Sequence, residues 1–411
     1  MKKENIKVSY DATWLAEYNK LNVMHGGLRV SIELISRMNK ENDVDVFFAV
    51  NKWDPALLNS LRSLVLEKYG YNKSRILNNN FNINYPNIES KILSKINNFL
   101  NSKIHNNRIF NSKSLANIDI YHTPLEAIPK EVKHFKHIKK VFTSHDLMPF
   151  VRPDISPPRF YDILKPAYDS IDETTTVIAV SNSTKTDLLN YRTDLKEEQV
   201  KVVYIAADKN VFYPNEGLTQ FNYMKIKYNF QFEGYLLCLN RIQKYKNTQL
   251  VIDVYIDLVN EGHLEDIGLL LIGTFESSKV KSEYLLKYSK YKIKFIDFVP
   301  DEELSIFYSN SICFIYMSLF EGFGLPILEA MQCGTPVICS SVKSLPEISG
   351  DACIIQDPYD KVLLANNILK ICENESLRNY LMYKGIIQSQ QFSWEKHIKE
   401  VKQIYYNILS D

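Results

Sequence analysis

The feature that most constrains the fold is a regular alternation of short apolar runs with amphipathic segments. Helical periodicity marks residues 28–38 and 247–260, for example, and β-rich runs flank both segments. Strands that alternate with helices in this way predict parallel sheets joined by crossover helices. The runs that predict strands are 6–10, 44–49, 118–122, 140–144 and 176–180, then 235–239, 267–272, 293–298, 312–317 and 336–339.

The length of the chain predicts two such sheets. At 411 residues the chain is too long for one ordinary core and fits two domains of roughly 200 residues each. The rhythm of strands and helices lapses at 206–214, AADKNVFYP, where we place the boundary. The predicted fold class is therefore α/β, with two Rossmann-like domains facing each other across a cleft. Ligands of such sheets bind beyond the carboxyl ends of the strands.

Composition excludes several classes of protein. A hydrophobic share of 45% argues against a largely disordered chain, and a net charge of +1 argues against a dedicated nucleic-acid binder. The six cysteines form no Cys-x-x-Cys metal or redox motif, which favours buried, reduced thiols. We see no signal peptide and no apolar run of the ~20 residues that a spanning helix needs. We expect a cytoplasmic protein that at most contacts a membrane surface.

Two basic regions leave the membrane question open. Residues 72–114 are rich in Asn, Lys and Ser and contain an amphipathic stretch at 88–104, which could lie on an anionic membrane. The alternative that we favour is a helix packed on its own domain. A cationic cluster further on could extend a basic surface, although a solvated face is the commoner arrangement. Its members are Lys130, Lys133, His134, Lys136, His137, Lys139 and Lys140.

A segment with two glycines, EGFGLP at 321–326, follows a predicted strand and opens a helix that contains Glu329. Proline suits the first helical position, and glycine lets a ligand approach the backbone closely. The free N–H groups and the dipole at a helix start favour a diphosphate. Glu321 and Glu329 would repel phosphate, so they are better suited to accept hydrogen bonds from sugar and ribose hydroxyls. A purely structural glycine turn is the alternative.

The segment NRIQKYKN at 240–247 follows another predicted strand and supplies positive charge. Arg241 can bind phosphate oxygens through two parallel hydrogen bonds, and Lys246 adds a point charge. Breaking a glycosyl phosphate bond leaves negative charge on the departing nucleotide, and fixed cations lower that barrier. Solvated surface charges are the alternative interpretation.

Two features of the first half complete the candidate site. Gly26 and Gly27 join the first predicted strand to the first predicted helix and could place N–H groups near phosphate or acceptor. His145 follows the strand predicted at 140–144 and could contact the reacting sugar or help to place the acceptor. It could equally be a core histidine that hydrogen-bonds Asp146. Ser181 begins a helix, where N-capping explains it without a further role.

Together these segments resemble the family-four glycosyltransferases, which have the GT-B fold. The strongest part is the pair Glu321 and Glu329 within EGFGLPILEAMQCGTPVI. NRIQKYKN is similar to the family's Arg–Lys diphosphate clamp, and FVPDEEL at 298–304 is similar to its base-contacting turn. The ending 392–409 looks like the terminal helix that crosses back to the first domain. The resemblance implies an acceptor-side domain at 1–208, a nucleotide-sugar domain at 209–390 and a crossing helix at 391–411.

Carried over to this chain, the resemblance implies roles for single residues. Arg241 and Lys246 would hold the diphosphate, Glu329 would bind the ribose and Glu321 would hold the donor sugar. Further implied contacts are made by the backbone near Val299 to the base and by His145 to the donor sugar. The remaining implied donor-binding residues, which contact the phosphate or the sugar through their backbone, are Gly26, Gly27, Phe323, Gly324 and Leu325.

The resemblance also implies the reaction. A hexose would move from a GDP- or UDP-linked donor to a glycan, a lipid-linked acceptor or another surface glycoconjugate, with retention at the anomeric carbon and without a metal or cofactor. The departing phosphate would itself take the acceptor's proton, so no side-chain nucleophile is expected. Two alternatives remain: a catalytically silent partner that binds nucleotide sugars in a glycan assembly complex, and an epimerase or synthase of the same fold.

Overall fold

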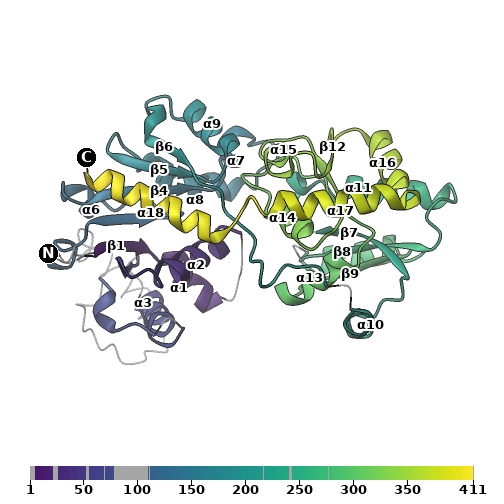
Figure 1. Ribbon diagram of the computed structural model, residues 1–411, viewed down its shortest axis with the longest axis horizontal. Helices are drawn as coiled ribbons and strands as arrows, with labels where there is room; N and C mark the ends of the chain where they lie inside the picture. Colours follow the sequence, from purple (N-terminus) through teal and green to yellow (C-terminus); the bar gives the residue numbers. More distant parts are fainter. Residues whose placement is uncertain are drawn as a thin grey trace.

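The computed structural model describes residues 5–21, 26–51, 55–68, 70–77, 110, 112–215, 217–239, 243–275 and 277–410 (Figure 1). It has two parallel six-stranded sheets, in the orders β2-β1-β3-β4-β5-β6 and β12-β11-β10-β7-β8-β9. We call the part from β1 to β6, together with the last helix, the N-terminal lobe, and the part from β7 to α17, with α10, the C-terminal lobe. The predicted fold class is confirmed.

The N-terminal sheet consists of β1 (Ile6–Asp11), β2 (Val44–Ala49), β3 (Ile120–Thr123), β4 (Lys139–Ser144), β5 (Thr175–Ala179) and β6 (Val200–Val202). Its connections contain helices and short turns of helix. They are α1 (Thr13–Leu21), α2 (Gly26–Met38), α3 (Pro55–Ser63), η1 (Leu64–Lys68), η2 (Lys73–Arg75), α5 (Ser112–Leu115), α6 (Lys130–His134), α7 (Met148–Val151), α8 (Pro158–Asp169), α9 (Asn182–Tyr191) and η3 (Glu197–Gln199).

The C-terminal sheet consists of β7 (Gly234–Leu239), β8 (Ile267–Ile272), β9 (Ile293–Ile296), β10 (Cys313–Tyr316), β11 (Val337–Ser340) and β12 (Ile354–Gln356). Its helices are α10 (Leu218–Lys227), η4 (Lys244–Lys246), α11 (Thr248–Asn260), α12 (Ser278–Lys287), α13 (Asp301–Ser309), α14 (Leu325–Gln332), α15 (Leu345–Ser349), α16 (Lys361–Glu373) and α17 (Glu375–Ser389). The chain ends in α18 (Trp394–Ser410).

Each sheet has a point where the order of its strands reverses. In the N-terminal sheet β1 lies between β2 and β3, and in the C-terminal sheet β7 lies between β8 and β10. Two connections leave in opposite directions at such a point, so a crevice opens at the carboxyl ends of the two central strands. The pairs β1–β3 and β7–β10 therefore mark where a ligand is expected in each lobe.

One sequence-based expectation about the first lobe is wrong. Gly26 and Gly27 do not join the first strand to the first helix, because another helix, α1, lies between β1 and this glycine pair. The Asp11 carboxylate accepts the backbone N–H of Thr13 at 2.9 Å, which satisfies one of the free donors at the helix start. Leu15 and Ala16 are buried, so one face of this short helix joins the core. The glycine pair opens α2 instead.

The last helix, α18, lies on the N-terminal lobe although it follows the C-terminal lobe in sequence (Figure 1). Ile398, Val401 and Tyr405 belong to the same hydrophobic core as β1 and β2. A buried polar contact also ties the helix down, because the Tyr405 hydroxyl is 2.6 Å from Nδ1 of His122 in β3. The first strand, β1, and the last helix, α18, consequently lie on the same lobe.

Candidate active site

The adjacent strands β7 and β10 carry the first two predicted site residues at their carboxyl ends. Lys246 ends the turn η4 after β7, and Glu321 follows β10. The Lys246 Nζ atom donates a hydrogen bond to Glu321 Oε1 at 2.6 Å, and the two side chains are 15% and 14% exposed. The structure therefore brings together the predicted diphosphate-binding lysine and the predicted sugar-binding glutamate.

Two neutral hydroxyls hold Glu321 in place. The Tyr316 hydroxyl donates to Glu321 Oε1 at 2.6 Å, and the Ser318 hydroxyl donates to the same atom at 2.7 Å. Burial and then the charge of Glu321 raise the pKa of Tyr316 well above its ordinary value, so the phenol stays a donor. A fixed carboxylate beside an ammonium group can accept hydroxyls of a sugar while the ammonium faces a phosphate.

The other half of the predicted clamp, Arg241, lies outside the described residues, as do its neighbours 240 and 242. Its role with phosphate stays a prediction. On either side of it, β7 ends at Leu239 and η4 begins at Lys244.

The glycines at 322 and 324 are required by close contacts. Gly324 precedes α14 with a φ of 101°, in the left-handed region that favours glycine, and a Cβ there would lie 2.5 Å from Leu345 Cδ2. A Cβ on Gly322 would lie 1.8 Å from the backbone oxygen of His145. The Phe323 side chain is buried against Tyr204. A ligand would therefore meet this loop through its backbone, which continues at Leu325 into α14.

His145 comes close to both lobes' glycine segments. It follows β4, its backbone meets Gly322 of the C-terminal lobe, and its imidazole faces the start of α2. A Cβ on Gly27 would lie 3.5 Å from His145 Cδ2 and 3.6 Å from Nε2. Gly26 has open space at the corresponding position, with nothing within 4 Å. These predicted residues thus converge on one place between the lobes.

Hydrogen bonds from the N-terminal lobe fix the loop of Gly322. The Ser181 hydroxyl donates to the Gly322 carbonyl at 2.6 Å, and the Thr184 hydroxyl donates to it at 3.0 Å. In the opposite direction, Glu347 of the C-terminal lobe accepts the backbone N–H of Asn182 at 2.8 Å. A carboxylate at the start of α9 satisfies free helix donors and the positive end of the dipole. The lobes are therefore in contact around the candidate site.

Glu329 lies inside α14 and is 3% exposed. Burial raises the pKa of its carboxyl. The positive charge of Arg29 opposes that rise in pKa, and the negative charge of Asp301 adds to it. Arg29 comes from α2 of the N-terminal lobe and forms ion pairs with both Glu329 and Asp301. Val299, the predicted base-contacting residue, is buried and lies two positions before Asp301. Arg29 thus links the predicted ribose-binding residue to Asp301, which belongs to the segment 298–304 that carries the predicted base contact.

Comparison with known proteins agrees with this arrangement. Residues 222–388 match the family of glycosyl transferases group 1. O-antigen chain mannosyltransferase B of Escherichia coli is 30% identical over 282 residues, which cover 67% of this chain and 71% of that protein. The chain belongs to the group 1 glycosyltransferases. The predicted resemblance to the family-four glycosyltransferases is confirmed, and the chain is an enzyme of glycosyl transfer.

Further comparisons find a weaker sequence match and a shared fold for this glycosyltransferase. Serotype-specific mannosyltransferase WbdA of Escherichia coli is 26% identical over 264 residues, and the match spans 62% of this chain but 32% of that protein. Sucrose-phosphate synthase from Thermosynechococcus elongatus has the same fold, with a TM-score of 0.69 and 17% identity over 99% of this chain and 100% of that one. Both lobes, as far as the structure describes them, therefore follow the GT-B arrangement.

Several residues at the site were missed by sequence reasoning. Arg29 stands two positions after the glycine pair. The only sequence feature that could have pointed to it is its positive charge close to a predicted phosphate contact. Tyr316 lies inside an apolar run and reads as core. Ser181 was explained by N-capping, and it does cap α9 by accepting the N–H of Thr184 at 3.0 Å, but it also holds Gly322. One side chain with two partners cannot be recognised from spacing.

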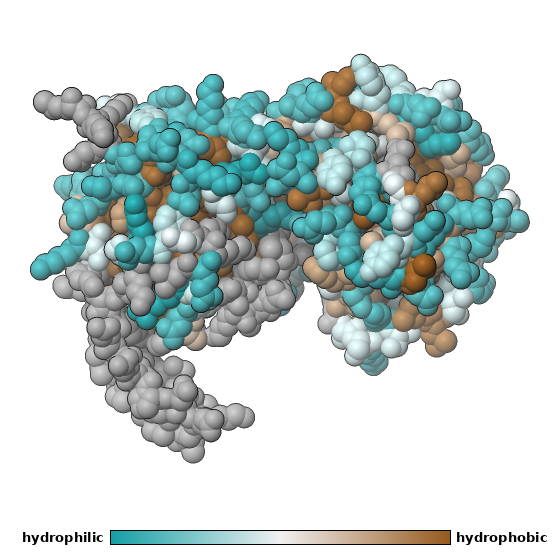
Figure 2. Space-filling model, turned by 60° about the horizontal axis from the view of Figure 1, so that its bottom comes forward, coloured by the Kyte–Doolittle hydropathy of each residue, from teal (hydrophilic) through white to brown (hydrophobic). Residues whose placement is uncertain are grey.

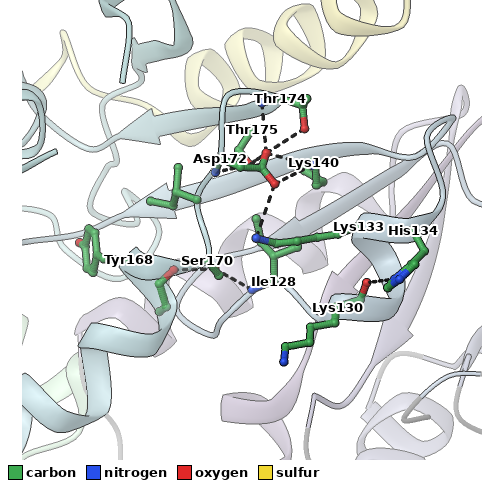
Figure 3. Close-up of polar contacts among 12 residues, drawn as sticks. Ile128, Lys130, Lys133, His134, Lys140, Tyr168, Ser170, Asp172, Thr174 and Thr175 are labelled. Carbon is green, nitrogen blue, oxygen red and sulfur yellow. Dashed lines mark hydrogen bonds and ion pairs between the residues drawn. The ribbon is translucent and has the colours of Figure 1, made fainter. Parts of the chain in front are cut away.

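Two lysines of the cationic cluster at 130–140 form internal ion pairs with one carboxylate (Figure 3). Lys140 Nζ lies 2.9 Å from Asp172 Oδ1, and Lys133 Nζ lies 3.5 Å from Oδ2 of the same carboxylate. Although burial opposes it, hydrogen bonds from Lys140 and neighbouring threonines lower the pKa of Asp172. Lys140 stands near the amino end of β4, whereas His145 follows its carboxyl end. The structure therefore does not bring this cluster to the candidate site.

The predicted membrane contact remains a prediction. The stretch 88–104 lies outside the described residues, together with most of 72–114. Among the helices that the structure describes, none is long and apolar enough to cross a membrane. On the face seen in Figure 2, hydrophobic side chains form separate patches among hydrophilic ones wherever the atoms are coloured. The cytoplasmic location likewise stays a prediction.

Proposed function

We propose that this glycosyltransferase transfers mannose, with retention at the anomeric carbon, from a nucleoside-diphosphate donor to a growing cell-surface polysaccharide. The names of the relatives support mannose and a polysaccharide acceptor, because they include an O-antigen chain mannosyltransferase of which the match covers 71%. GDP-mannose is the first donor to test. UDP-linked hexoses are the comparison, since the sequence is compatible with both.

The observation that carries the proposal is the paired arrangement of Lys246 and Glu321 at the carboxyl ends of β7 and β10, opposite His145 of the other lobe. In the proposed reaction the bond from the sugar C1 to the phosphate oxygen breaks, and a bond from C1 to the acceptor oxygen forms on the same face. The acceptor's proton passes to the departing phosphate oxygen. Lys246 stabilises the negative charge that develops there, and Glu321 orients the sugar through its hydroxyls.

The test is a transfer assay with GDP-mannose, UDP-glucose and a synthetic mannoside acceptor, followed by NMR of the new linkage. We expect product with GDP-mannose, with the anomeric configuration of the donor, in the presence of EDTA. Glu321→Gln and Lys246→Met should abolish most of the product. Lys384→Met is the matched control, because Lys384 lies on α17, pairs with Asp351 and has no place in the candidate site.

Other outcomes would overturn parts of the proposal. Inverted product would contradict retention, and activity that EDTA removes would contradict metal independence. Nucleotide binding without transfer to any of a panel of mannoside and glucoside acceptors would favour a silent binding partner. Full activity of both site variants would remove Lys246 and Glu321 from the reaction.

A further inference from the structure

Arg29 connects the N-terminal lobe to two acids of the C-terminal lobe. It lies in the first turn of α2, two positions after Gly27. Its Nη2 atom donates to Asp301 Oδ1 at 2.6 Å, and its Nη1 atom donates to Glu329 Oε1. Asp301 is the first residue of α13, and Glu329 lies in α14. One guanidinium group therefore joins three helices from both lobes.

The charges around Glu329 make the loss of Arg29 costly. Glu329 is 3% exposed, and a buried carboxylate is costly unless it is paired and hydrogen-bonded. The groups that act on it are Arg29 from α2 and Asp301 and Tyr308 from α13. Arg29 opposes the effect of burial on the pKa of Glu329, whereas Asp301 repels its charge. Removal of the guanidinium would leave two neighbouring acids without this compensating charge.

The contact uses only part of the hydrogen-bonding capacity of the same carboxylate. An ionised carboxylate offers about four lone-pair sites in all. Arg29 uses a site on Oε1 of Glu329, and the Tyr308 hydroxyl donates to Oε2 at 3.3 Å. Capacity remains for the two hydroxyls of a ribose. The guanidinium is planar and is also held by Asp301, so it fixes the plane in which Glu329 presents the remaining sites.

We propose that Arg29 is a positioning residue, supplied by the N-terminal lobe, that holds Glu329 ready for the ribose of a nucleoside diphosphate. Because the arginine and the glutamate belong to different lobes, nucleotide binding depends on contact between the lobes. The inference rests on the proposed function in one respect, namely that Glu329 binds the ribose. It adds a residue that reaches the nucleotide site from the opposite lobe and acts through Glu329.

The test is calorimetric titration of the full chain with GDP and with UDP. We expect Arg29→Gln to weaken the binding of the preferred nucleotide by roughly tenfold or more, because an uncompensated acid takes the place of an oriented one. Arg29→Lys keeps the positive charge without the planar guanidinium, so its nucleotide affinity should lie between those of the unmodified chain and Arg29→Gln. Arg37→Gln is the matched control, because Arg37 lies on the same helix and pairs with Glu33 and Asp208.

A double-mutant cycle separates positioning from a general structural effect. If Arg29 acts through Glu329, adding Arg29→Gln to Glu329→Gln should change the nucleotide affinity by less than about threefold. Equal additional losses in both backgrounds would overturn the inference. Tighter binding by Arg29→Gln would also overturn it, because the arginine would then be a competitor for the ribose site.

The failure of this inference can be told apart from failure of the proposed function. If the unmodified chain binds neither GDP nor UDP, the proposed donor class is wrong. If it binds one of them and Arg29→Gln binds it equally well, only the role of Arg29 is wrong. Circular dichroism of each variant shows whether it is folded. If Arg29→Gln does not fold, the affinity of Arg29→Lys is the test instead.

Discussion

The two lobes share an architecture but contribute to the site in different ways. In the C-terminal lobe the candidate groups lie in two continuous segments after β7 and β10, and Lys246, Tyr316 and Ser318 satisfy Glu321 within the lobe. In the N-terminal lobe single residues from separate connections, such as Arg29 and His145, reach across. The comparison teaches that one lobe builds the charged site by itself, whereas the other completes it by contact.

The N-terminal lobe contains two buried histidines that contact other parts of the chain. His122 in the N-terminal sheet lies 2.7 Å from the Thr143 hydroxyl and 2.6 Å from the Tyr405 hydroxyl of α18. Burial lowers the pKa of His122 to about 3, and burial likewise lowers the pKa of His397 on α18 to about 4. These neutral histidines stand where the last helix meets its lobe. The N-terminal lobe thus depends on polar contacts with a distant part of the chain.

Removal of the charge in the C-terminal lobe should have the largest effect. We expect Lys246→Met to lower kcat by about 100-fold to 1,000-fold, as for the loss of one group that stabilises developing charge. Initial rates at saturating donor measure this, with Lys384→Met as the control. A loss no larger in Lys246→Met than in the control would mean that the C-terminal lobe does not build the charged site.

Loss of the contact between the lobes should have the next largest effect on activity. A methyl group at position 322 would collide with the backbone oxygen of His145, which cannot move as a side chain can, so Gly322→Ala should separate the lobes locally. We expect kcat/KM to fall by roughly 100-fold, because small displacements of reacting groups are costly. The melting temperature of the variant and its solution scattering profile show whether each lobe stays folded.

A glycine without such a neighbour gives the control for that variant. Gly217 precedes α10, and a Cβ there would meet Gln220 Oε1 at an ordinary 3.5 Å. Gly217→Ala should keep its activity. Equal activity of both alanine variants would show that close contact at Gly322 is not needed for the reaction.

The smallest expected effect concerns pH and the last helix. Because His397 stays neutral in the fold while the unfolded chain takes up a proton below about pH 6.5, its contribution to stability is lost as the pH falls toward 4. His397→Phe should therefore reduce the pH dependence of the unfolding free energy by up to about 1.4 kcal/mol per pH unit in that window.

Tryptophan fluorescence can follow this transition in the N-terminal lobe. Two of the three tryptophans, Trp14 and Trp394, lie in α1 and α18 of that lobe. His263→Gln is the control, because His263 is an exposed residue of the C-terminal lobe. An unchanged pH dependence in His397→Phe would contradict a neutral, buried histidine at this junction.

Much of the fold could be predicted, because apolar runs and helical periodicity are local. The predicted helix at 247–260 is α11, Thr248–Asn260, and Gly262 beyond its end has a positive φ of 83°. The short helix α1 was missed because its 9 residues give only about two and a half turns in which a period can show. The placement of Lys246 and Glu321 could be predicted, because each follows a predicted strand. The two strands are neighbours in the sheet.

The rest of the site could not be predicted for a physical reason. Arg29 and Glu329 are 300 residues apart, and nothing in either local segment specifies the other. The same holds for Ser181 and Gly322, which meet when the lobes dock. The roles assigned to all the predicted site residues stay predictions, and Arg241 also lies outside the described residues. Contacts between lobes depend on the relative placement of two cores, which no local pattern encodes.

The central claim is that a nucleoside diphosphate binds between the lobes, with its phosphates at Lys246 and its ribose at Glu329. A crystal structure of the full chain with GDP tests it most directly. The account predicts phosphate oxygens within hydrogen-bond distance of Lys246 Nζ, ribose hydroxyls on Glu329, and Arg29 still paired with that glutamate. A nucleotide bound away from both residues, or a ribose that has displaced Arg29, would contradict it.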